Sequence, residues 1–172
     1  MNMPFSRIIL LCLIVLLGTS ACGFNLRSAQ PLPPGIEQVY LSGTQQHSPL
    51  RRELRKYLKI YQIPTITEAP STKQTQTVAI YLMPDSLDRR LLSLFTTGQV
   101  AEYELVLTIR FQVAFAGQEA QYVEFDVTRE YQDDPDAILA KSRELDLVLS
   151  ELRQQAADRI IRMLPSLDSR QQ

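Results

Sequence analysis

The 172-residue sequence contains no tryptophan, a single histidine and two cysteines. These are too few side chains for a metal site built from histidine and cysteine, so such a site is nearly excluded. A catalytic triad would have to use His47, which lies in the polar run GTQQHSP and is expected on an exposed surface loop. The G-x-S-x-G nucleophile elbow of many hydrolases is also absent. We therefore expect neither a metal cofactor nor a triad-based hydrolase.

An excess of charge of either sign is missing as well, because the net charge is -1 at pH 7. A nucleic-acid-binding domain is expected to carry a basic excess. Nucleic acid is therefore not an expected partner.

The N-terminal segment has the pattern of an export signal. Its apolar run, Ile8 to Leu17, is too short to span a bilayer, which needs about 20 residues, but suits the core of a signal peptide. Small residues and then Cys22 follow, which resembles the lipobox of bacterial lipoproteins, with Thr19 where Leu is typical. The resemblance implies a lipoprotein signal peptide over residues 1–21, cleavage before Cys22, and anchoring by acyl chains such as palmitate. The alternative is a secreted protein with a free Cys22, disfavoured because an unpaired thiol would then persist in an oxidising compartment.

The sequence after Cys22 predicts where the protein resides and how it is organised. In lipoproteins of this kind, Asp after the lipidated Cys tends to retain the protein in the inner membrane, so Gly23 favours the outer membrane, facing the periplasm. Residues 22–35 contain three prolines and are predicted to form a lipidated tether. A single α+β domain is expected over residues 36–165, followed by a flexible tail at 166–172.

The strongest structural pattern is the stretch from Val100 to Gly117. From Tyr103 to Phe115 every odd position is apolar, whereas the even positions are mixed. In an extended chain this alternation places one apolar row on a single face. We therefore predict a long central strand whose apolar face is covered by amphipathic helices at either end of the domain.

The remaining elements are predicted from shorter signals. Alternation indicates strands at 36–41, 78–83, 87–95 and 120–131, with a kink at 84–85 and hairpin turns at 96–99 and 117–118. Helical periodicity predicts two helices, each with an N-cap residue followed by a proline. The first runs from Pro49 to Tyr61, with Ser48 as its N-cap. The second runs from Asp134, its N-cap, to about Leu164 and is ended by Pro165. The expected fold is a two-layer α+β sandwich, in which two helices pack on one face of a mainly antiparallel, mixed sheet of about four strands.

The helix at 49–61 has an unusual polar side. Its basic residues gather beside the apolar stripe with no acid among them, at Arg51, Arg52, Arg55, Lys56 and Lys59. This side could contact anionic lipid or a phosphate-bearing partner. Alternatively, it is simply a solvated helix face, as charged faces usually are.

Four short strings together resemble the family of the LPS-assembly lipoprotein LptE. They are CGFNLR at 22–27, GQVAEY at 98–103, DPDAILAK at 134–141 and RIIRMLP at 159–165. They occur in the family's order and span nearly all of the mature chain. The resemblance implies a non-enzymatic outer-membrane lipoprotein that plugs and helps assemble the β-barrel protein LptD as a heterodimer. It also implies binding of lipopolysaccharide for delivery to the cell surface.

The resemblance also points to residues that would bind lipopolysaccharide. One basic position of the family matches Lys141, and another falls at Thr96, where the family can carry Arg. Arg89 and Arg90 lie just before Thr96 and are the candidate replacements.

Two other classes of function are considered. One is a periplasm-facing lipid carrier with an internal acyl-binding cavity. The other is a lipoprotein hydrolase, which the missing nucleophile elbow and the lone His47 disfavour.

Overall fold

The computed structural model describes residues 32–45, 47–70, 75–132 and 138–168, with the backbone alone at 138–142. The predicted signal peptide at 1–21, the tether as far as residue 31 and the end of the tail at 169–172 lie outside the described residues. The fold belongs to the compact unit Pro31–Gln172. His47 is exposed in a turn, as predicted.

The predicted central strand is the longest strand of the sheet, β5 (Val100–Phe115). Its odd positions from Leu105 to Phe115 are at most 2% exposed, which confirms the apolar row. Two antiparallel strands follow one another along one side of β5: β3 (Thr77–Leu82) pairs with its C-terminal part and β4 (Ser86–Leu94) with its N-terminal part. Along the other side, β6 (Gln121–Gln132) pairs with β5 from Glu102 to Val113.

The sheet has six strands rather than the expected four or so, because the kinked segment forms the two strands β3 and β4 and a two-residue strand is added at 65–66. The predicted first strand, β1 (Gln38–Gly43), lies parallel to β3. The two-residue strand β2 (Thr65–Ile66) pairs in parallel with the outer side of β1. The order is therefore β2-β1-β3-β5-β4, with β6 paired to β5. This mixed sheet has β2 at one edge and β6 at the opposite edge, while β4 lies on the same side of β5 as β3.

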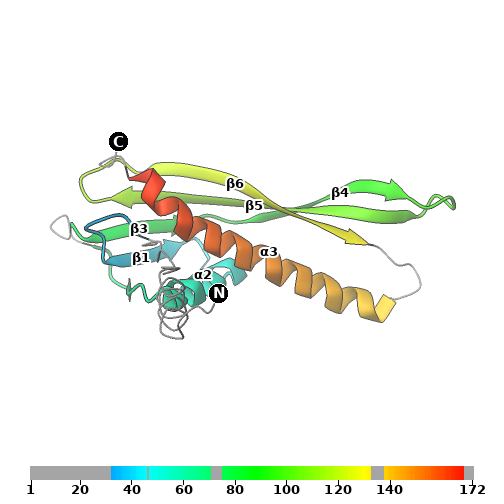
Figure 1. Cartoon of the computed structure of the whole chain (residues 1–172), viewed down its shortest axis with the longest axis horizontal. Coiled ribbons are helices and arrows are strands. Elements are labelled where there is room, and N and C mark those ends of the chain that lie inside the picture. Colours follow the sequence, from blue (N-terminus) through cyan, green and yellow to red (C-terminus); the bar gives the residue numbers. More distant parts are fainter. Residues whose placement is uncertain (1–31, 46, 71–74, 133–137, 169–172) are drawn as a thin grey trace, which may run out of the picture. The chain divides into compact units, whose positions relative to one another are not determined.

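Two helices cover one face of the sheet (Figure 1). The first, α2 (Pro49–Ile60), has Ser48 as its N-cap, whose hydroxyl accepts a hydrogen bond from the Arg51 amide at 3.2 Å. The second, α3 (Ile138–Leu167), packs against β6, β5 and α2. Its buried surface is wide and includes the adjacent pairs Ala156–Ala157 and Ile160–Ile161, because the helix contacts both the sheet and α2.

The end of α3 is where the sequence-based prediction was wrong. The helix continues through Pro165 to Leu167 instead of ending at Leu164. Contacts made by other parts of the chain hold this last turn: Gln121 Nε2 donates to the Leu167 carbonyl at 3.0 Å, and Gln118 Nε2 donates to buried Asp168 at 2.7 Å. These tertiary hydrogen bonds offset the backbone bond that proline cannot make.

Candidate functional site

The predicted binding residues Arg89 and Arg90 lie on β4, in the hairpin that this strand forms with β5. The hairpin forms as predicted, with Gly98 at a φ of +84° in its turn and the Phe95 amide donating to the Gln99 carbonyl at 2.8 Å. Arg89 is opposite Leu105 of β5, and Arg90 is opposite Glu104. Because neighbouring residues of a strand point to opposite faces, the two arginines lie on different faces of the sheet.

Arg89 lies on the face that carries the helices, since its partner Leu105 belongs to the buried apolar row. β4 is nevertheless exposed along its length, except at Ser86 and Ser93, which are half-buried. Arg89 is exposed and forms no hydrogen bond or ion pair with any described residue. Its guanidinium is therefore available to an external anion.

Large apolar side chains surround this cation and are also exposed. Leu87 and Leu91 flank Arg89 on the same row and are 38% and 54% exposed. Register shifts after Leu91 then break the alternation of β4. The tip of the hairpin consequently exposes further side chains, Leu92, Leu94 and Phe95. We call the group formed by Arg89 and these five apolar residues the hairpin surface.

Arg90, on the opposite face, has a partner. Its Nη1 is 3.5 Å from Glu104 Oε2 in an exposed ion pair, and Ser93 Oγ donates to the neighbouring Glu102 carboxylate at 2.8 Å. These acids make the far face of the hairpin less suitable for an anion than the face of Arg89.

The other residues predicted for the site are Thr96, Lys141 and Cys22. Thr96 is exposed in the hairpin turn. Lys141 belongs to the first turn of the described part of α3, but its side chain lies outside the described residues. Cys22 also lies outside them.

Sequence reasoning missed the exposed leucines at the tip, because an uninterrupted alternation was assumed from Leu87 to Phe95. Two adjacent leucines, Leu91 and Leu92, followed by Leu94, were the available signal that the alternation breaks. Among the described residues, no group of His, Cys, Asp or Glu is arranged to hold a metal ion. The same part of the chain contains no helix with both the length and the apolarity to cross a membrane.

Comparison with known proteins gives one consistent result. The model of the family "LptE: Lipopolysaccharide-assembly" matches residues 36–164. The LPS-assembly lipoprotein LptE of Yersinia enterocolitica is 33% identical over 92% of this chain and 75% of its own length. That of Pectobacterium atrosepticum is 32% identical over 92% of this chain and 85% of its own.

Solved structures agree with these relatives. The crystal structure of rare lipoprotein B from Shewanella oneidensis has a TM-score of 0.69 and 40% identity, covering 78% of this chain and 98% of that one. Lipoprotein B from Nitrosomonas europaea, 22% identical with a TM-score of 0.66 over 86% of this chain and 93% of its own, shares the fold. The match over residues 36–164 and the identity to these relatives establish that the chain belongs to the LptE lipopolysaccharide-assembly family.

Proposed function

We propose that this protein is a lipid-anchored outer-membrane lipoprotein that plugs the LptD β-barrel, helps it assemble, and binds lipopolysaccharide for delivery to the cell surface. The family match over residues 36–164 is the observation that carries this proposal. The anchor would be the acylated Cys22, and the domain would face the periplasm and the lumen of the barrel. The protein acts by binding and is not an enzyme.

The hairpin surface supports the lipopolysaccharide part of the proposal. Lipopolysaccharide is an amphiphile that joins phosphate groups to acyl chains. A suitable surface offers an unneutralised cation to the phosphate groups and exposed apolar side chains to the acyl chains. Arg89 and its neighbours Leu87 and Leu91 provide this combination. Lys141 would add a second cation at the N-terminal part of α3, where the helix dipole also favours an anion.

The two adjacent arginines allow a matched test of this surface. We expect Arg89→Gln to weaken binding of purified lipopolysaccharide about three- to tenfold, the effect of removing one charge-assisted contact. Arg90→Gln removes the same charge one residue away, on the face of Glu104, and should change the affinity less than about twofold. Titrations of the two full-length variants at one fixed ionic strength make the comparison. Equal affinities for the two variants would remove the hairpin surface from the site.

The barrel partner requires a separate experiment. Affinity isolation of the protein from outer membranes should recover LptD in a fixed ratio, and depletion of the protein should lower the amount of assembled barrel and of surface lipopolysaccharide. The lipid-carrier alternative predicts instead that lipid co-purifies without a barrel. Unchanged barrel levels after depletion would contradict the proposed role.

A further inference from the structure

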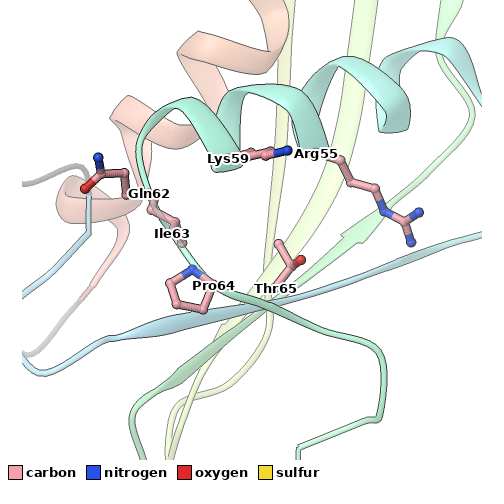
Figure 2. Close-up of a pocket in the computed structure, with 6 residues that line it drawn as sticks. All are labelled: Arg55, Lys59, Gln62, Ile63, Pro64 and Thr65. Carbon is pink, nitrogen blue, oxygen red and sulfur yellow. The ribbon is translucent and has the colours of Figure 1, made fainter.

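A second cationic site lies at the β2 edge of the sheet, separate from the hairpin surface. An open hollow of about 360 Å³ is present where α2 ends and the chain returns to β2. Figure 2 shows Arg55 and Lys59 extending from α2 above Thr65, with Pro64 beside it. Gln62 and Ile63, in the connecting turn, complete the lining.

The polar side chains that line this hollow are donors and include no acid. Arg55 offers a guanidinium, Lys59 an ammonium, Gln62 an amide and Thr65 a hydroxyl group. Neither Arg55 nor Lys59 makes a hydrogen bond or ion pair with any residue that the structure describes. The ion pair of α2, between Glu53 and Lys56 at 3.4 Å, does not involve the lining residues. The positive charge of the hollow is therefore not neutralised by these neighbours.

The spacing of the cations costs stability unless an anion lies between them. Arg51, Arg55 and Lys59 recur at intervals of four residues, which places like charges on one side of the helix, where they repel one another. The repulsion is evident at Arg51, where burial and then the charge of Arg55 lower the pKa of the guanidinium. The Arg51 guanidinium donates a hydrogen bond to the Leu41 carbonyl at 2.8 Å and does not line the hollow. Arg55 and Lys59 are the two cations that do (Figure 2).

The C-terminal end of a helix normally repels anions, but here its carbonyl groups are occupied. The carbonyls of Tyr57, Leu58 and Lys59 accept hydrogen bonds from the amides of Tyr61, Ile63 and Gln62, at 2.8 to 3.0 Å. This capping weakens the negative end of the helix dipole. It also holds Gln62 at a φ of +58°, a conformation that favours glycine. The chain thus carries an amide side chain at a position where glycine would be less strained.

We propose that this hollow binds a phosphate group, either of a phospholipid head or of a small soluble phosphate. Arg55 and Lys59 would pair with the phosphate oxygens, and the Thr65 hydroxyl would donate a further hydrogen bond, whereas the Gln62 side chain is directed away from these three (Figure 2). The buried Ile63 and the ring of Pro64 form the apolar side of the hollow, beside which the glycerol or alkyl part of the ligand can pack.

A lipid head is within reach if Cys22 carries the proposed anchor. Thr65 pairs with Val39 of β1, which follows Cys22 by 17 residues. A fully extended segment of that length spans at most about 60 Å, so the tether can bring the hollow to the surface of the leaflet that holds the acyl chains. The site itself, however, does not depend on the anchor.

The test is an NMR titration of the full chain, held in micelles of uncharged detergent, that follows the amide signals of Gln62, Ile63 and Thr65. One arm adds inorganic phosphate, and the other adds the anionic phosphatidylglycerol, with phosphatidylcholine, whose phosphate is balanced by its own quaternary ammonium, as the comparison without net charge. We expect these signals to move saturably with phosphate or with phosphatidylglycerol. The probe that saturates at the lower concentration identifies the source of the phosphate.

Two double variants separate a specific site from general attraction. Arg55→Gln with Lys59→Gln should weaken binding about tenfold, because both cations of the hollow are lost. Arg52→Gln with Lys56→Gln removes the same charge from the same helix, outside the lining, and should weaken it less than about threefold. All four side chains are exposed, so both double variants should fold. Circular dichroism checks that they do.

A single variant at the turn gives a further check. Gln62→Gly suits the positive φ and removes a side chain that is directed away from Arg55 and Lys59, so it should leave stability equal or higher and phosphate binding unchanged. Equal weakening by the two double variants, or no saturable movement with either probe, would overturn the proposal. Arg89→Gln should leave this titration unchanged, so the hollow and the hairpin surface can fail independently.

Discussion

Replacing Phe111 with alanine should destabilise the protein strongly. Phe111 is fully buried in β5, opposite Leu82 of β3 and Val123 of β6, so it lies where three strands meet. Its ring meets that of Phe125 edge to face, with centroids 6.4 Å apart. A buried Phe→Ala change costs about 3–5 kcal/mol, of which the aromatic pair contributes roughly 0.5–1.5 kcal/mol. That is a large part of the roughly 5–15 kcal/mol that stabilises a typical domain.

The sequence provides a control with the same chemical change. Phe95 is 45% exposed at the tip of the β4–β5 hairpin, so Phe95→Ala should cost less than about 1 kcal/mol. In urea, with a slope of about 2 kcal/mol per M, the unfolding midpoint should fall by roughly 1.5–2.5 M for Phe111→Ala and by less than about 0.5 M for Phe95→Ala. Similar midpoints for the two variants would refute the assignment of the core to this half of β5.

Three further predictions concern other parts of the chain. Cys22→Ser should release the protein into the soluble periplasm or leave it uncleaved, and mass spectrometry showing an unmodified Cys22 thiol on the wild-type protein would contradict the proposed anchor. Tyr61→Phe removes the 2.6 Å hydrogen bond that the Tyr61 hydroxyl donates to Asp158, and should cost about 1–2 kcal/mol in urea unfolding. Because that bond raises the pKa of Tyr61 in the folded state, its contribution is present below pH 10 and declines above it, so the gap between wild type and variant should narrow at alkaline pH. Lys141→Asp should weaken lipopolysaccharide binding whereas Lys73→Asp should not, and equal affinities would exclude Lys141 from the site.

The sequence was sufficient to predict the central strand and its coverings. The alternation from Tyr103 to Phe115 depends only on the two-residue period of a strand, and no other arrangement would bury that row. The kink at residues 84–85 was also predictable, since proline interrupts a ladder. These local signals identified the apolar row of β5 as part of the core.

What could not be predicted depends on contacts between distant segments. The parallel pairing of β1 with β2 and β3 requires α2 to cross between strands, and short polar segments such as Thr65–Ile66 carry no pattern that specifies a partner. The hollow at the end of α2 exists only because of this pairing. Which face of the sheet Arg89 and Arg90 each occupy likewise depended on the register with β5, which sequence alone left open.

The distribution of contacts along β5 suggests why one domain can be both stable and exposed. Its C-terminal half is enclosed by β3, β6 and the helices, and Gln118 and Gln121 fix the end of α3 against it. Its N-terminal half extends with β4 as a hairpin that leaves leucines in water, an arrangement that costs stability unless a partner covers them. Because the buried part of β5 extends from Leu105 to Phe115 and stops short of the hairpin tip, the tip can keep its apolar side chains for a partner without unfolding the domain. Substitutions at the hairpin tip should therefore affect recognition, and those around Phe111 should affect folding.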